Sequence, residues 1–216
     1  MARIKKQSLV AQIYAVLRED ILTLKYPLGG HINVNDIQEK YGVSSTPLRE
    51  ALNRLQQAGL VVIENNVGAS VTTLNAHDVE EIEEVAFTLQ TAAVKLSLAR
   101  GDREQMLQEI NEQVLRYSVA RNTRENLKAF HDLIGVFYHN CGNRRLDSSM
   151  IALQSQMLLL RYIYAECPGS GKNLDILEQI RDGVRDNSPK SILNALNEHI
   201  QRSHPEILNW LQKHNS

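Results

Sequence analysis

The stretch YGVSSTPLREALNRLQQAGLV, residues 41–61, constrains the fold more than any other part of the chain. It opens at Gly42, a residue type that commonly ends helices, and continues with Ser-Ser-Thr-Pro. Thr46 suits a helix N-cap, and Pro47 suits the first helical position. An apolar face follows at helical spacing, formed by Leu48, Ala51, Leu52 and Leu55. The stretch therefore predicts a turn followed by an amphipathic helix.

The segments on either side extend this pattern. Apolar residues at helical spacing predict a helix over about 7–24, which YPLGGHI breaks. A short helix, VNDIQEKYG, stops at Gly42, and the sequence after Gly59 alternates weakly and breaks at NNVG, which predicts a hairpin. Helix, short helix, glycine turn, helix and hairpin is the order of a winged helix-turn-helix, in which the helix after the turn projects outward.

The polar face of that projecting helix carries Ser45, Arg49 and Asn53, spaced four residues apart. Hydroxyl groups and helix N-terminal N–H groups suit phosphates, and the paired donors of an arginine suit a guanine edge. From periodicity alone, a structural helix with a solvated polar face explains the pattern equally well. Glu50 and Arg54, also four apart, fit an intrahelical ion pair better than contacts to DNA.

The particular residues of this helix favour the DNA-binding interpretation. VSSTPLREALNRLQQAGLV closely resembles the recognition helix of the GntR family of bacterial transcription regulators, whose usual form is close to V-S-R-T-P-V-R-E-A-L-x-x-L-x-x-x-G-L-V. The upstream LGGHINVNDIQEKYG and the downstream IENNVGASVTTL fall where that family has its turn, second helix and wing. The resemblance implies that Thr46 and Arg49 contact DNA and that Gly68 is the wing-tip glycine that enters the minor groove.

Three positions depart from the family pattern. Ser45 stands where arginine is usual, His31 where arginine commonly touches the DNA backbone, and Val67 where the wing often carries arginine or lysine. Each departure removes a cationic contact, so we expect weaker and less salt-dependent non-specific binding. The basic residues Arg3, Lys5 and Lys6 either compensate in part or form a disordered tail.

Length and composition set the frame for the rest. The 216 residues suffice for two modest domains, and a net charge of −1 excludes a uniformly basic nucleic-acid coat but not a local basic face. Cys141 and Cys167 form neither a metal pattern nor a disulfide framework, and no apolar run is long enough to span a bilayer, which predicts a cytoplasmic protein. The pattern of turn signals and apolar residues changes near TTLNAHDVEE. This change predicts a mainly α fold in two parts, a winged helix-turn-helix over 1–74 and an antiparallel all-α bundle over 75–216.

The second part reads almost entirely as long amphipathic helices with few glycines or prolines. The first of these helices shows an apolar stripe that includes Ile82, Val85 and Leu89, and either Asn75 or Asp78 suits its N-cap. A helix bundle is the natural way to bury several such stripes. The predicted helices run over about 77–100, 102–120, 123–140, 143–166, 172–187 and 189–214.

This part resembles the FCD ligand-binding domain of the FadR subgroup of the same family, through AFHDLIGVFYHNCGNRRL and a later His-Ile at 199–200. Many such domains hold a divalent metal through an aspartate and a histidine four apart on one helix and two histidines about 22 apart on the last two helices. His131 and His199 remain, but Leu127 and Leu177 occupy the other two positions. Two neutral imidazoles without a carboxylate make a poor site, so a bound metal is the weaker alternative.

The pocket predicted for this part is less polar than in metal-dependent members, because Ala86 and Gln90 replace an arginine and a glutamate that are usual there. An arginine inside such a pocket would suit a carboxylate. Three alternatives stay open: a metal-free site for an organic effector, metal-assisted sensing of a small acid, and a domain that mainly dimerises. Both histidines also fit buried, paired side chains, and the arginine also fits the surface. The residues predicted to line an effector pocket are His131, His199, Tyr138 and Arg161.

Together these resemblances imply a homodimeric transcription regulator, a repressor by default. It would bind a near-palindromic double-stranded DNA operator and respond to a small organic effector, a carboxylic acid among the candidates. One alternative is a protein–protein adaptor that keeps the fold without binding DNA. The other is a metal-dependent enzyme using His131 and His199. No nucleophile–base set, phosphate loop or reactive carboxylate pair supports an enzyme. The sequence identifies neither the effector nor the operator.

Overall fold

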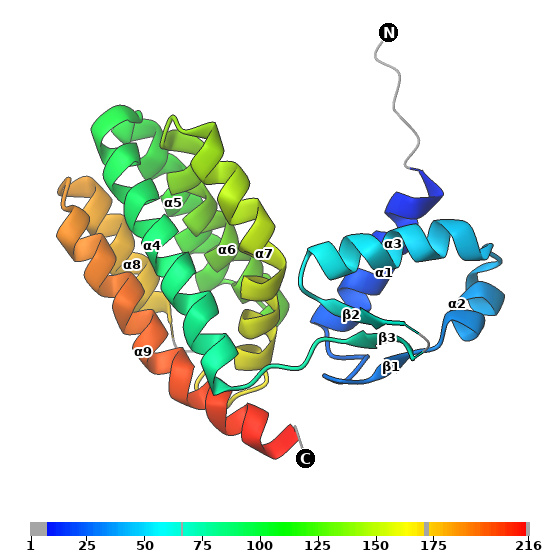
Figure 1. The fold of residues 1–216 in the computed structure, drawn as a ribbon. Helices are drawn as coiled ribbons and strands as arrows, with labels where there is room; N and C mark the ends of the chain where they lie inside the picture. Colours follow the sequence, from blue (N-terminus) through cyan, green and yellow to red (C-terminus); the bar gives the residue numbers. More distant parts are fainter. Residues whose placement is uncertain (1–7, 66, 171–172, 215–216) are drawn as a thin grey trace, which may run out of the picture. The chain divides into compact units, whose positions relative to one another are not determined.

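The structure, a computed structural model, describes residues 8–65, 67–170 and 173–214. The chain divides into two compact units, one ending at Leu74 and the other running from Asn75 to Lys213. Figure 1 shows helices around a small sheet in the first unit and helices alone among the described elements of the second. The predicted mainly α fold, with a winged helix-turn-helix followed by a helical bundle, is confirmed.

The first unit is built on the contact of α1 (Leu9–Leu22) with α3 (Ser45–Gln57). The apolar face of α3 is buried, as predicted. In the sequence, α2 (Val34–Tyr41) lies between these two helices and ends at Gly42, which has a φ of 62°. Glycine is the residue type that adopts this left-handed conformation without a steric penalty, so it allows the chain to turn sharply into α3.

The start of α3 differs from the prediction. Its N-cap is Ser44 rather than Thr46, so Pro47 is the third helical residue rather than the first. The first four N–H groups of a helix have no acceptor within it, and proline, which lacks an N–H, is tolerated throughout that turn. Pro47 therefore indicates a helix start without fixing its residue, and the prediction of Thr46 as the cap was wrong.

A three-stranded antiparallel sheet completes the first unit, with β3 (Gly68–Val71) between β1 (His31–Ile32) and β2 (Val61–Glu64). The predicted hairpin is β2 and β3, paired from Val61 opposite Val71 to Glu64 opposite Gly68. The first strand was not predicted, because two residues are too short to show a periodicity. It pairs His31 with Ser70 and so joins the hairpin to the α1–α2 connection.

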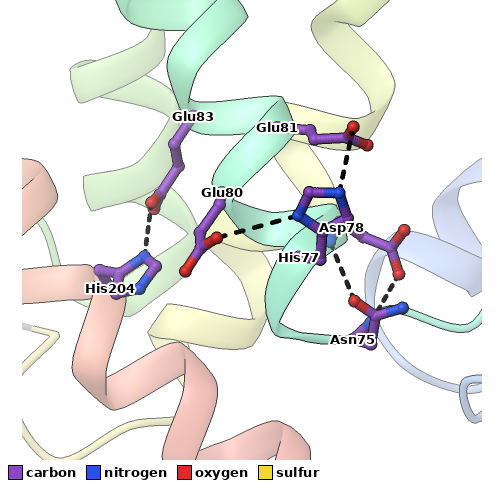
Figure 2. A network of polar contacts seen from close by, with 7 residues as sticks. All are labelled: Asn75, His77, Asp78, Glu80, Glu81, Glu83 and His204. Atoms are coloured by element: carbon purple, nitrogen blue, oxygen red, sulfur yellow. Dashed lines mark hydrogen bonds and ion pairs between the residues drawn. The ribbon is translucent and has the colours of Figure 1, made fainter.

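The second unit consists of helices whose bounds lie close to the predicted ones. The helices are α4 (Ala76–Arg100), α5 (Arg103–Ser118), α6 (Thr123–Asn140), α7 (Arg144–Ala165), α8 (Leu174–Arg185) and α9 (Pro189–His214). A capping box begins α4: Asn75 accepts a hydrogen bond from the Asp78 N–H, and the Asp78 carboxylate accepts one from the Asn75 N–H (Figure 2). None of the helices within the described ranges is long and apolar enough to cross a membrane.

The core of the bundle centres on α6, which contacts α4, α5 and α7, while α5 also packs on α8. Leu133 and Phe137 of α6 are almost completely buried. Polar contacts join α9 to its neighbours, through Arg202 to Asp175 of α8 and through His204 to Glu83 of α4. The predicted stripe of α4 is wrong at Val85, which is 51% exposed, because the buried face of this helix instead includes the polar residue Glu83.

Candidate functional site

The exposed face of α3 carries the residues predicted to contact DNA. Ser45, Thr46, Arg49 and Asn53 are all exposed, while the apolar residues of the helix are buried on its other face. No described residue pairs with the Arg49 guanidinium, whereas Arg54 donates to Glu50 at 2.7 Å. The expected intrahelical pair is therefore present, and Arg49 keeps its donors free for an external acceptor.

The wing places two further predicted residues beside each other. Gly68 begins β3 with a φ of 118°, and a Cβ atom added there would lie 2.9 Å from Cε1 of His31. The His31 side chain is exposed on β1 and so lies next to the wing tip. Val67 is 67% exposed. The basic residues 3–6 fall outside the described part of the chain.

Within the bundle, Arg161 of α7 stands out because its charge is buried. It is only 7% exposed, its guanidinium carbon lies 5.3 Å from the centre of the Phe130 ring, and no described carboxylate pairs with it. Burial lowers the pKa of Arg161 to about 10, a shift that the charge on Tyr138 partly opposes. A buried cation without an anion is costly, so it either serves an uncommon structural role or awaits a ligand.

Arg161 is held by His131 of α6. Its Nη1 atom lies 2.9 Å from Nδ1 of His131, and the side-chain amide of Gln154 lies 2.9 Å from Nε2 of the same ring. Guanidinium nitrogens can only donate, so Nδ1 accepts and Nε2 carries the proton of a neutral ring. Because Nε2 of Gln154 is the atom that faces this proton, a flip of the amide lets its oxygen accept from Nε2 of His131. His131 therefore positions Arg161 through a fixed hydrogen-bond chain.

His199 of α9 lies against two aromatic rings, with its centroid 4.4 Å from that of Phe130 and 5.9 Å from that of Tyr164. Its Nδ1 atom is buried, and no described residue supplies a hydrogen bond. Burial, followed by the charges of Arg161 and Arg202, lowers the pKa of His199 to about 3. The ring is therefore neutral at physiological pH, with one unsatisfied nitrogen.

A small inner cavity of about 40 Å³ lies between α4, α6, α7 and α9, bordered by His199, Arg161, Phe130 and Gln90. Ala86 also lines it, so both positions predicted to make the pocket less polar do face it. At its edge Glu83 contacts His204 at 2.6 Å (Figure 2), and burial raises the pKa of Glu83 despite that contact. This space holds only a few water molecules and is mostly apolar in its lining.

A larger open groove of about 560 Å³ lies between α5, α6 and α7. His131, Tyr138 and Arg161 line it, together with Gln154 and several carboxylates. The Tyr138 hydroxyl is buried without a described partner, and burial raises its pKa. Three of the four predicted pocket residues thus share this groove, and Arg161 alone among the four borders both the groove and the inner cavity.

The residues near His131 and His199 do not fit a metal ion. Both ring nitrogens of His131 are engaged, and one of them faces the Arg161 cation. Within the described ranges, no group of three or more His, Cys, Asp or Glu side chains is placed to bind a metal. Leu177 is buried in the apolar core, and Leu127 lies beside a cavity near Phe130. The Arg161 guanidinium therefore lies beside His131, where the sequence offered a bound metal as the weaker alternative.

Sequence reasoning missed Gln154, Glu83 and Gln113, although all three line the cavities. Gln154 and Arg161 reach His131 across 23 and 30 residues of sequence. Glu83 reaches His204 across 121. Helical periodicity could have placed them on inward faces, but it gives no partner across such separations.

Comparison with protein families agrees with this description. Residues 9–71 match the family described as bacterial regulatory proteins, gntR family. An uncharacterized HTH-type transcriptional regulator of Bacillus subtilis, YdhC, is 30% identical over 135 residues, which span 60% of this chain and 60% of that protein. The matched family and this relative are regulators rather than enzymes, in agreement with the expectation against an enzyme.

Solved structures share the fold over nearly the whole chain. Escherichia coli McbR/YncC has a TM-score of 0.76 at 19% identity, covering 96% of this chain and 99% of that one. A transcriptional regulator GntR from Rhodococcus sp. RHA1 has a TM-score of 0.74 at 21% identity, covering 94% and 99%. Over residues 9–71, the family match coincides with the helix-turn-helix and wing that carry Arg49 and Gly68. Residues 9–71 therefore form a winged helix-turn-helix domain of the gntR family of bacterial regulatory proteins.

Proposed function

We propose that this protein is a homodimeric DNA-binding transcription regulator whose affinity for its operator changes when a small organic effector binds its helical unit. The observation that carries the DNA-binding part is the exposed, unpaired Arg49 on α3, on the same face as Ser45 and Asn53. A projecting helix of this kind reads base edges in the major groove, and a two-fold dimer calls for a near-palindromic operator.

The roles within this surface follow from chemistry. Arg49 presents two parallel donors to a guanine edge, and Asn53 lies one helical turn further along the same stripe. The hydroxyls of Ser45 and Thr46 lie at the α3 N-terminus, where N–H groups also face phosphate. His31 and Gly68 form the tip of the wing, which would approach the minor groove.

Gel-shift titration of the protein's own promoter region tests this proposal. Arg49→Ala should weaken binding by about 5- to 150-fold, which corresponds to the loss of one bidentate base contact of about 1–3 kcal/mol. Arg54→Ala is the matched control, because Arg54 is also exposed on α3 but is paired with Glu50. Equal losses for the two variants, or no binding by the wild type, would contradict the proposal and favour a protein–protein adaptor.

The effector part of the proposal rests on Arg161. Its buried guanidinium lacks a described carboxylate partner and borders both the groove and the inner cavity, so an anionic effector would supply the missing charge. His131 orients the guanidinium, while His199 and Tyr138 offer polar atoms without described partners. Effector binding changes operator affinity only by the difference in effector affinity between the two DNA-binding states.

A thermal-shift screen of short carboxylic acids, performed without added metal, tests this part. Acids that stabilise the wild type should not stabilise Arg161→Gln, whereas Arg144→Gln, on the exposed first turn of α7, should respond like the wild type. Hits should also change promoter affinity in the gel-shift assay. Stabilisation of Arg161→Gln to the same extent as the wild type would show that the anion does not bind this guanidinium.

A further inference from the structure

The groove between α5, α6 and α7 has the dimensions of a formed binding site. Its volume of about 560 Å³ falls inside the range of roughly 300–1,000 Å³ that is typical of small-molecule sites. The inner cavity, at about 40 Å³, would have to expand before it could admit an organic molecule. The groove therefore decides which class of effector can reach Arg161 in this conformation.

Two buried polar side chains in the groove lack hydrogen-bond partners among the described residues. Gln113 is 7% exposed and Tyr138 is 5% exposed, and the Gln113 amide oxygen and the Tyr138 hydroxyl are both without a described partner. Leaving a buried polar group of this kind unsatisfied lowers the stability of the folded protein. The amide oxygen can only accept, and the hydroxyl can accept or donate, so a ligand carrying N–H donors would satisfy both.

The walls of the groove carry carboxylates, and two of these lack a neutralising cation. Glu112 pairs with Arg116, and Asp132 with Lys128. Within the described ranges, Glu109 receives only the Gln105 amide, and no cation lies within ion-pair distance of Asp147. The groove thus combines unneutralised negative charge on its walls with the positive charge of Arg161.

The helical positions separate Arg161 from the Asp147 carboxylate along the groove. Arg161 reaches the level of His131 on α6, and Tyr138 lies seven residues further along the same helix, a rise of about 10 Å. On α7, Asp147 likewise precedes Gln154 by seven residues. Burial raises the pKa of Tyr138, and the charges of Arg161 and Asp147 act on this pKa in opposite directions, so Tyr138 lies between the cation and the carboxylate. One end of the groove therefore suits an anion and the other a cation.

We propose that the effector is a zwitterion, with its carboxylate on Arg161 and an ammonium group about one short aliphatic chain away, near Asp147 and Tyr138. The inference rests on the effector site proposed above and specifies its ligand class. A simple carboxylate would meet the negative walls without compensation, and a simple amine would leave Arg161 unpaired. A zwitterion neutralises both charges, and its ammonium group supplies a donor to the unsatisfied Tyr138 oxygen.

Three probes of equal chain length separate these possibilities: 6-aminohexanoate, hexanoate and hexylamine. In isothermal titration calorimetry with the full-length protein, 6-aminohexanoate should bind at least tenfold more tightly than either of the other two. Arg161→Gln should reduce 6-aminohexanoate binding to the level of hexylamine. Asp147→Asn should reduce it to the level of hexanoate, while the control variant Glu104→Gln, which changes an exposed first-turn carboxylate outside the groove, should leave it unchanged.

The outcomes distinguish this inference from the proposal on which it rests. If hexanoate binds the wild type as tightly as 6-aminohexanoate and loses affinity in Arg161→Gln, the anion site stands and the zwitterion is wrong. If hexylamine binds as tightly as 6-aminohexanoate, Arg161 takes no part in recognition. Absence of binding by 6-aminohexanoate, or binding that neither Arg161→Gln nor Asp147→Asn alters, would overturn the inference in full.

Discussion

The two candidate sites of this protein use arginine in opposite ways. Arg49 is exposed on α3, and its neighbours in the proposed DNA surface lie within one turn of the same helix. Arg161 is buried in the bundle and contacts His131 across 30 residues of sequence, and Gln154 contacts the same histidine across 23. The first site is a local sequence motif with fixed spacing on one helix, whereas the second forms only when three helices pack together.

This contrast has an energetic counterpart. The charge of Arg49 remains solvated, so it adds little to folding and stays available for DNA. The charges and polar atoms around Arg161 are held away from water, where the absence of a partner costs free energy. We therefore expect substitutions at the buried site to change stability strongly, and substitutions at the exposed site to change mainly binding.

The largest effect should come from acidifying His199. Its pKa in the folded protein, about 3, lies below the ordinary value of 6.5, so the folded state binds fewer protons than the unfolded state between these values. The contribution of neutral His199 to the free energy of unfolding is fully present above about pH 6.5 and is lost as the pH falls toward 3. His199 contributes at most about 1.4 kcal/mol per pH unit to the slope of the unfolding free energy against pH.

Urea unfolding from pH 7 to pH 4 measures this slope. His199→Phe, which keeps an apolar ring but cannot take up a proton, should flatten it, while the matched variant His77→Gln, at an exposed histidine, should not. If the slopes of His199→Phe and the wild type coincide, His199 is not held neutral by burial, and the contrast between a buried and an exposed site weakens.

The next largest effect concerns Arg161 itself. Arg161→Met should raise the free energy of unfolding of the ligand-free protein by about 1–3 kcal/mol, because an unpaired buried charge is replaced by an apolar side chain of similar length. The gain exceeds the hydrogen bond lost from His131, about 1 kcal/mol. Chemical denaturation without ligands measures it.

Arg144→Met, on the exposed first turn of the same helix, should stay within about 0.5 kcal/mol of the wild type. Destabilisation by Arg161→Met instead would mean that the guanidinium is a structural element of the core. The case for an anionic effector would then lose its main support.

The same contrast explains what the sequence could predict. The order of elements and most helix bounds followed from periodicity and capping residues, because these are local properties. The α3 surface followed from a motif with fixed spacing around Arg49. The inner site was predicted in part: Arg161 and His131 were named, but the hydrogen-bond chain through Gln154 and the unsatisfied Gln113 oxygen depend on the packing of α5, α6 and α7. Thr46 and Val85 show the other limit, since a proline and an apolar residue do not by themselves determine a cap or a buried position.

A smaller effect is expected at the wing. Gly68→Ala should destabilise the first unit by about 1–2 kcal/mol, because a φ of 118° is strained for any residue with a Cβ atom. The added Cβ would also approach His31, but that side chain is exposed and can rotate away. The strain therefore lies mainly in the backbone, and promoter affinity should fall with it.

Two variants separate these causes by thermal denaturation and gel shift. The double variant His31→Ala/Gly68→Ala should remain destabilised, whereas full recovery would assign the effect to the side-chain clash. Gly135→Ala is the contrasting control in the interior of α6, where an added Cβ meets only an ordinary 3.6 Å contact. It should raise stability by up to about 1 kcal/mol, because alanine favours helix.

The smallest effect should be found on α3, in the ion pair between Arg54 and Glu50. Its two side chains are 48% and 53% exposed, so solvent screens the pair despite its 2.7 Å separation. A double-mutant cycle with Arg54→Met and Glu50→Gln should give a coupling of about 0.3–0.5 kcal/mol that falls further at high salt. A coupling above about 1.5 kcal/mol would mean that the charges on the exposed helix contribute substantially to folding, and that its polar face is structural rather than left free for DNA.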